Sequence, residues 1–131
     1  MLPTLFPQIT PANEPFWKLA SQGQLALPCC HRCGHLWSPP SPHCPQCLSA
    51  DFSYRPLSGR ATLWSWITMH RTYFPEFPAP YIVAFVQLEE GPMLMSTLQA
   101  GDPETLHCDM PLQVCFRPLS PDMAMHQFKP A

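Results

Sequence analysis

The chain has 131 residues, which is enough for one domain or for a small metal module joined to one compact domain. Its formal net charge is −2 and it has only seven Lys and Arg residues, which argues against a site for nucleic-acid phosphates. Charged residues make up 12% of the chain, against roughly a quarter in ordinary soluble domains, while hydrophobic residues reach 46%. We therefore expect apolar surface to be left over for a partner.

The chain has no recognisable export or membrane signal. Its first ten residues, MLPTLFPQIT, lack the basic region and the apolar core of a secretion signal. The longest apolar run, Tyr81 to Val86, is too short to cross a bilayer. Seven cysteines, an odd number, fit a reducing compartment better than a disulfide framework. These features predict a cytoplasmic protein that does not enter a membrane.

Residues 1–27 are predicted to form an extended arm followed by one helix, and a short strand over 24–28 is predicted to lead into the next segment. Asn13 is placed to cap the start of that helix, and Gly23 suits its end. Phe16 and Trp17 lie on the apolar side of the helix. They either anchor a partner protein or cover the helix's own domain.

Residues 28–52 contain the most specific motif, two Cys-x-x-Cys pairs separated by a ten-residue spacer. Four thiolates at this spacing are the ligand set of a structural zinc site, and the four ligands are Cys30, Cys33, Cys44 and Cys47. Iron is the less favoured metal, although four thiolates also bind iron. Gly34 and Ser49 suit the tight reversals after the two pairs, and Trp37 in the spacer is expected to cover one side of the metal.

Other histidines and cysteines lie near this motif or further along the chain. The histidines beside the cysteines are His31, His35 and His43. We expect none of them to bind the metal, because four thiolates already close a structural site. The cysteines outside the two pairs are Cys29, Cys108 and Cys115. They are predicted to be buried, and His107 is poorly placed to activate its neighbour Cys108 because adjacent strand residues face opposite sides.

Residues 53–131 have the composition of a small β-barrel. β-Branched and aromatic residues predict strands over 60–73, 81–88, 93–98, 112–117 and 123–128. Three prolines exclude 74–80 from a sheet, and a single helical turn is expected over 101–106. A long first strand that can serve two sheets, followed by short strands, indicates a closed barrel of the OB type.

No catalytic motif is present. The chain has no Gly-rich phosphate loop, no nucleophile elbow and no His-Glu-x-x-His helix, so we expect no enzyme activity of the chain on its own. One polar cluster, formed by His70, Arg71 and Tyr73, is placed to hold a phosphate or to orient a substrate. Simple solvation at a loop is the alternative interpretation.

Several methionines are spaced two residues apart. They are Met93 with Met95 and Met123 with Met125, and Met110 stands alone. Period-two spacing puts each pair on one face of a sheet, which is ordinarily the core. A lining for a flexible acyl chain or for a partner protein is the alternative.

From Pro15 to Phe128 the chain resembles a family of acyl-CoA-associated proteins built from an N-terminal helix, a rubredoxin-like zinc ribbon and an OB-fold. The resemblance rests on four stretches in the family's order: FWKLASQGQLALPCCHRCGHLWSPPSPHCPQC, SGRATLWSW, APYIVAFVQLEEGPMLMSTL and GDPETLHCDMPLQVCF. It implies a mainly β fold with that architecture. Asp109 stands where the family has a glycine, and because Asp tolerates left-handed backbone we expect the turn to survive.

The resemblance also implies a function. Members of the family act with thiolase-like proteins, especially of the sterol-carrier type, or with hydratases in acyl-CoA pathways. The resemblance therefore implies a non-catalytic accessory subunit that binds a thiolase-like enzyme in a hetero-oligomer. The implied role is to help form the acyl-CoA site for retro-aldol cleavage, acyl transfer or condensation of CoA thioesters, as part of an acyl-CoA lyase or acyltransferase complex. Contacts with the partner or with acyl-CoA are expected at Phe16, Trp17, His70, Arg71 and Tyr73. The alternative is a single-stranded nucleic-acid binder, for which the basic groove is missing.

Overall fold

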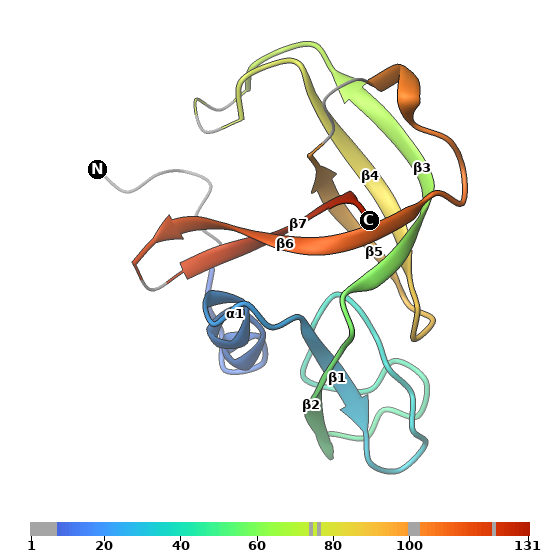
Figure 1. Ribbon diagram of the computed structural model, residues 1–131. Helices are drawn as coiled ribbons and strands as arrows, with labels where there is room; N and C mark the ends of the chain where they lie inside the picture. Colours follow the sequence, from blue (N-terminus) through green and yellow to red (C-terminus); the bar gives the residue numbers. More distant parts are fainter. Residues whose placement is uncertain (1–7, 74, 76, 100–102, 122) are drawn as a thin grey trace.

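The computed structural model describes residues 8–73, 75, 77–99, 103–121 and 123–131 (Figure 1). Parts of the predicted arm, loop and helical turn, at residues 1–7, 74, 76, 101 and 102, lie outside these residues. The elements in chain order are α1 (Glu14–Ser21), β1 (Ala26–Cys30), β2 (Phe52–Pro56), β3 (Arg60–Met69), β4 (Tyr81–Leu88), β5 (Met93–Leu98), the 3-10 helix η1 (Pro103–Thr105), β6 (Pro111–Ser120) and β7 (Met123–Pro130). Neither helical segment in this described part has the length and apolarity to cross a membrane.

Helix α1 forms where the sequence predicts it, with Asn13 at the N-cap position. The side chain of Asn13 does not cap the helix, however, because its Oδ1 turns back to accept a hydrogen bond from the Thr10 amide at 2.7 Å. Gly23 ends the helix as expected. Its φ of 80° turns the chain, so that the Gln24 amide donates to the Leu19 carbonyl at 2.9 Å.

Strands β1 and β2 make a small antiparallel sheet that runs from the pair Ala26 and Pro56 to the pair Cys30 and Phe52. β2 is absent from the sequence prediction, and β1 lies two residues later than the strand expected over 24–28. The reason is that β2 is mostly exposed and depends on its partner strand for its conformation. Because β1 ends at Cys30, the sheet carries the first Cys-x-x-Cys turn directly.

The other five strands form a closed barrel in the order β3-β4-β5-β7-β6, and β3 pairs with both β4 and β6. A register shift between Leu63 and Ser65 bends β3 and lets it serve both neighbours. β4 and β5 have the predicted bounds, while β3 ends at Met69 rather than at residue 73. The predicted fold class, mainly β with an N-terminal helix, a four-cysteine module and an OB-type barrel, is confirmed.

Helix α1 closes one end of the barrel. Phe16 is buried and belongs to the same apolar core as Leu63, Val86 and Phe128 of the barrel strands. Trp17 packs against this core while remaining half-buried. Figure 1 shows α1 beside the β6–β7 hairpin, with the β1–β2 sheet below the barrel. Phe16 is therefore part of the core, while Trp17 keeps part of its ring at the surface.

Candidate metal centre and apolar groove

The four paired cysteines converge on one point. Their Sγ atoms all lie within 4.8 Å of one another. The Sγ atoms of Cys30 and Cys47 are 3.5 Å apart, and those of Cys33 and Cys44 are 3.6 Å apart. Zinc–sulfur bonds of about 2.3 Å in a tetrahedron place sulfurs about 3.8 Å apart. The cluster therefore has dimensions that can hold one metal ion, as the spacing predicts.

The peptide backbone favours a thiolate in this cluster. The amides of Cys33 and Arg32 point at the Cys30 sulfur from 3.5 Å and 3.4 Å. The Cys33 amide has the largest effect, and together with the Arg32 amide and the thiols of Cys47 and Cys33 it lowers the pKa of Cys30 to about 6 against the opposing effect of burial. Since the thiolate is the form that binds metals, the turn prepares its first cysteine for a metal ion.

Trp37 covers the buried side of the cluster, as predicted. It is buried against Cys30 and Cys44, and Phe52 of β2 packs on the same group. The rings of Trp37 and Phe52 meet edge to face with centroids 5.2 Å apart. His35 stacks on Trp37 at 6.2 Å, so this imidazole belongs to the cover. The apolar side of the module thus rests on the β1–β2 sheet.

His31 joins the first cysteine turn to β2. Its Nδ1 lies 2.9 Å from Asp51 Oδ1, and its Nε2 lies 2.8 Å from Ser53 Oγ. This order of groups matches the relay of serine hydrolases, but all three side chains are exposed and no water-excluding cleft surrounds the serine. We interpret these contacts as structural: they hold the turn that begins at Cys30 against β2.

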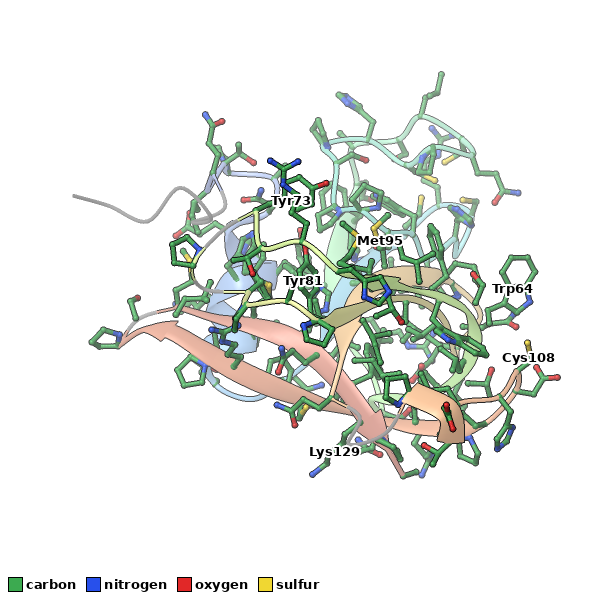
Figure 2. All side chains as sticks on the ribbon, turned by 90° about the horizontal axis from the view of Figure 1, so that it is seen from above. Trp64, Tyr73, Tyr81, Met95, Cys108 and Lys129 are labelled. Atoms are coloured by element: carbon green, nitrogen blue, oxygen red, sulfur yellow. The ribbon has the colours of Figure 1, made fainter. Side chains whose placement is uncertain are left out.

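The remaining cysteines differ in exposure. Cys29 and Cys115 are half-buried, and burial raises the pKa of the Cys115 thiol. The prediction that Cys108 is buried is wrong, because it is exposed next to Trp64 and its thiol points at the Trp64 carbonyl from 3.7 Å (Figure 2). Asp109 explains the error: its left-handed φ of 66° turns the chain so that Met110, and not Cys108, enters the core.

The residues predicted to contact a partner or acyl-CoA fall into two groups. Phe16 and Trp17 meet on α1 with ring centroids 5.0 Å apart. His70, Arg71 and Tyr73 are exposed in the loop after β3, where the Arg71 guanidinium lies 5.3 Å from the Tyr73 ring centroid. No contact in the described residues joins these two groups, so the structure does not form one site from all five.

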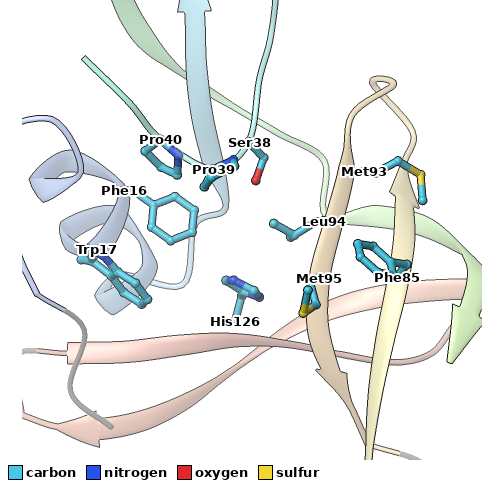
Figure 3. A pocket seen from close by; sticks show the side chains of 10 residues that line it. All are labelled: Phe16, Trp17, Ser38, Pro39, Pro40, Phe85, Met93, Leu94, Met95 and His126. Carbon is cyan, nitrogen blue, oxygen red and sulfur yellow. The ribbon is translucent and has the colours of Figure 1, made fainter. Parts of the chain in front are cut away.

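An apolar groove runs between α1 and the outer side of β4 and β5. It consists of two adjoining cavities of about 390 Å³ and about 340 Å³ that share Trp17, Met95 and His126. The first cavity extends under Pro39 and Pro40 of the cysteine module (Figure 3). The groove thus connects all three parts of the chain: helix, cysteine module and barrel.

The second cavity of the groove continues toward the loop between β3 and β4. Phe77 of that loop lines it together with Tyr81 of β4 and Met125 of β7. The Arg117 guanidinium lies over the Phe77 ring, 4.8 Å from its centroid. This part of the wall is therefore largely aromatic and thioether, with a cation against one of its rings.

The methionines of β5 belong to this groove and not to the core. Leu94, Ser96 and Leu98 occupy the inward positions of the strand, so Met93 and Met95 face outward. Met95 is 57% exposed. The expectation of core packing is therefore wrong for this pair, and the alternative of a lining surface describes it better.

His126 is a polar residue in the groove that the sequence analysis missed. Its Nδ1 lies 2.8 Å from Ser96 Oγ, and the same hydroxyl lies 3.2 Å from the His126 carbonyl. The ring meets Phe16 edge to face at 5.8 Å. Burial lowers the pKa of His126 to about 4, so the imidazole is uncharged at neutral pH. The only sequence signal was a histidine that directly follows three apolar residues of the predicted strand 123–128.

Comparison with known proteins agrees with this architecture. Residues 54–117 match the family described as "ChsH2, C-terminal OB-fold domain". The "probable enoyl-CoA hydratase alpha subunit" of Thermomonospora curvata is 32% identical over 125 residues, which is 95% of this chain and 39% of that protein. The "3-oxo-4,17-pregnadiene-20-carboxyl-CoA hydratase alpha subunit" of Mycobacterium tuberculosis is 31% identical over 97 residues, 74% of this chain and 31% of that protein. The chain thus spans only about a third of the length of these two relatives.

One solved structure matches nearly end to end. The protein described as "Ltp2-ChsH2(DUF35) aldolase" superposes with a TM-score of 0.87 at 31% sequence identity. The match covers 95% of this chain and 98% of the matched chain. The suspected family resemblance is therefore confirmed: the chain belongs to the DUF35 family, and its barrel is an OB-fold domain of the ChsH2 C-terminal type.

Proposed function

We propose that the chain is a non-catalytic accessory subunit that binds a thiolase-like enzyme and helps to form that enzyme's acyl-CoA site. The observation that carries the proposal is the end-to-end match to the DUF35 chain of a structure described as an Ltp2-ChsH2 aldolase. The buried Ser96 hydroxyl lies 2.8 Å from His126 Nδ1, but it also lies 3.2 Å from the His126 carbonyl, which can accept its only hydrogen, so this pair is not arranged as a nucleophile and its base. This supports a role in positioning and assembly rather than in bond breaking.

The cysteine cluster would hold a structural zinc ion through Cys30, Cys33, Cys44 and Cys47. Four thiolates fill all tetrahedral positions of zinc, which leaves no position open for water or substrate. Zinc would therefore supply folding free energy and fix the relative positions of β1 and the spacer. Through Pro39 and Pro40 of the spacer it would also fix one wall of the groove.

The outer face of β3, β4 and β5 is the surface that we assign to the partner. Ile67 and Phe85 are 58% and 43% exposed, and Met95 stands beside Phe85 in the register of β4 and β5. Val83 pairs with Ile67 and completes the strip. We call these four residues the apolar face. Aromatic residues and methionine are enriched at protein interfaces, and a chain with so few charges has little to compensate such exposed area.

The reaction of the complex follows from the names of the relatives, as part of the proposal. The matched structure is described as an aldolase, and one relative as a hydratase subunit for a steroid-type CoA thioester. We therefore propose that the partner cleaves or forms a carbon–carbon bond in a lipid or steroid CoA thioester. None of the seven cysteines is in a disulfide, which supports assembly in the cytoplasm.

Co-expression with a thiolase-like protein encoded next to this chain tests the proposed function. The zinc-loaded chain and the enzyme should elute together in size-exclusion chromatography at low and at moderate salt, because the proposed contact is apolar. Two separate peaks under both conditions would contradict the proposal. A filter-binding titration with single-stranded DNA at low salt is the matching test of the alternative, and micromolar affinity there would favour a nucleic-acid binder.

A further inference from the structure

The hydrogen bonds of His126 define which nitrogen of the ring is free. Ser96 Oγ carries one hydrogen and lies within hydrogen-bond distance of both the His126 carbonyl and His126 Nδ1. Both contacts are satisfied at once only if the hydroxyl donates to the carbonyl and Nδ1–H donates to the hydroxyl oxygen. Nδ1 then carries the ring proton. Nε2 is left as an unprotonated acceptor.

The free edge of the imidazole faces the groove. No described residue offers a hydrogen-bond partner to Nε2. The ring lines both cavities, and Figure 3 shows it in the first. The walls around it come mainly from Trp17, Phe77 and Met95, none of which has a side-chain acceptor as strong as the imidazole. The hydroxyl residues Ser38, Tyr81, Ser96 and Thr97 also line the cavities, so the groove combines a largely apolar lining with a few polar groups, among which Nε2 can only accept; this is the usual make-up of a site for a small ligand.

The chemistry of this acceptor selects the ligand. An unprotonated Nε2 takes a hydrogen bond from a hydroxyl and repels a carbonyl oxygen or a carboxylate. The lowered pKa of His126 keeps the ring uncharged, so it offers no cation to a carboxylate either. Cavities of about 340 to 390 Å³ are of small-molecule size.

We infer that the groove binds the apolar part of a hydroxylated acyl or alicyclic thioester, whose hydroxyl donates a hydrogen bond to His126 Nε2. The choice of a thioester rests on the proposed function. His126 positions the hydroxyl, and Trp17 and Met95 enclose the adjoining carbon chain. A ligand of the same skeleton without the hydroxyl fills the same space but leaves Nε2 without a partner, so it binds more weakly.

Calorimetric titration of the zinc-loaded chain with two matched probes tests this inference. The probes are the N-acetylcysteamine thioesters of 3-hydroxydecanoic acid and of decanoic acid. The hydroxylated probe should bind roughly three- to tenfold more tightly, which is the usual effect of one hydrogen bond. His126→Phe should abolish this difference while both probes still bind. Long-range ¹H–¹⁵N correlation spectra should show a protonated Nδ1 and a shift of Nε2 when the hydroxylated probe is added.

A pair of equally exposed residues supplies the control. Met95 lines the groove and is 57% exposed, whereas Trp64 is 59% exposed and lies outside the groove lining. Met95→Lys should abolish binding of both probes, and Trp64→Lys should leave both affinities unchanged. Equal affinity of the two probes for the wild-type chain, absence of binding, an Nε2–H tautomer, or equal loss in the two lysine variants would overturn the inference.

The titration and the assembly test fail independently. If the probes do not bind as predicted but the chain still forms the complex, only the ligand assignment is overturned. Ligand binding by a chain that never joins a thiolase-like enzyme overturns the proposed function alone.

Discussion

Gly34 and Leu48 occupy equivalent positions in the two cysteine turns. Each follows a Cys-x-x-Cys pair, and each amide donates back to the first cysteine of its pair, Gly34 to the Cys30 carbonyl at 3.0 Å and Leu48 to the Cys44 carbonyl at 2.8 Å. Both have left-handed backbones, with φ of 76° and 65°. The reversal after the second pair therefore falls on a leucine, and not on Ser49 as the sequence suggested.

Replacing Leu48 by glycine should stabilise the protein. A left-handed leucine costs about 1 kcal/mol relative to glycine, and this side chain is 74% exposed, so little packing is lost. We expect Leu48→Gly to raise the free energy of unfolding in urea by up to about 1 kcal/mol. Gly34→Ala should lower it by a similar amount, because a Cβ there meets no atom within 4 Å and only the backbone conformation matters. A loss of stability in Leu48→Gly would show that the side chain is packed.

Gly59 should tolerate substitution much less than Gly23. Both have φ of 80°, but a Cβ on Gly59 would lie 2.4 Å from Val114 Cγ1 of β6, whereas a Cβ on Gly23 meets nothing within 4 Å. Gly59→Ala adds a clash to the conformational cost, so we expect a loss of about 2 to 4 kcal/mol against about 1 kcal/mol for Gly23→Ala. Urea denaturation measures both. Equal losses would mean that β6 moves freely away from the start of β3.

Stability should fall as the pH drops below 6.5, because His126 is buried in its neutral form. Burial lowers the pKa of His126 to about 4, so between that value and the unfolded value near 6.5 only the unfolded chain takes up the proton. The stability provided by the neutral ring is thus complete above pH 6.5 and is lost as the pH falls toward 4. We expect a loss of about 2 kcal/mol between pH 7.5 and pH 5.

The variant His126→Phe isolates this effect. The cysteine cluster and the other histidines respond to pH in both proteins, so the difference between wild type and variant reports His126 alone. Between pH 7.5 and pH 5, the free energy of unfolding in urea should fall by about 2 kcal/mol less in the variant than in the wild type. Parallel curves would mean that His126 keeps an ordinary pKa in the folded chain.

Removal of the metal should unfold the cysteine module. Structural zinc supplies folding free energy on the order of 10 kcal/mol in small modules. Cys44 is buried at the centre of the cluster, so Cys44→Ser should give zinc-free or insoluble protein, and the wild-type chain should lose its cooperative thermal transition in a chelator. Cys29→Ser, beside the cluster but outside it, should keep one zinc per chain by elemental analysis. Unchanged thermal stability in the chelator would contradict a structural role for the metal.

The sequence predicted best those elements that local signals delimit. Tyr81 to Leu88 and Met93 to Leu98 have the predicted bounds because prolines and a Glu-Glu-Gly-Pro turn surround them. The cysteine spacing likewise predicted a cluster that the structure forms. The strand at Phe52–Pro56 was missed because its partner lies far back in the chain and supplies most of its order.

The groove could not be read from local patterns. Trp17 and His126 come from opposite ends of the chain and meet only because α1 closes the barrel beside β7. Alternation in β5 identified one face for Met93 and Met95, but it gave no sign of which face is inward; Leu94 and Leu98 fill the interior instead. Burial depends on the assembled barrel, and periodicity alone describes only the two faces.

The affinity of the zinc-loaded chain for its thiolase-like partner, measured by calorimetry, tests the proposed docking most directly. Ile67→Lys places a charge in the apolar face and should weaken the complex at least tenfold, or about 1.4 kcal/mol. Gln22→Lys adds the same charge at the exposed end of α1 and should leave the affinity within about twofold. Equal affinities for wild type and both variants, or no complex with the wild-type chain, would contradict assembly through the outer face of β3, β4 and β5.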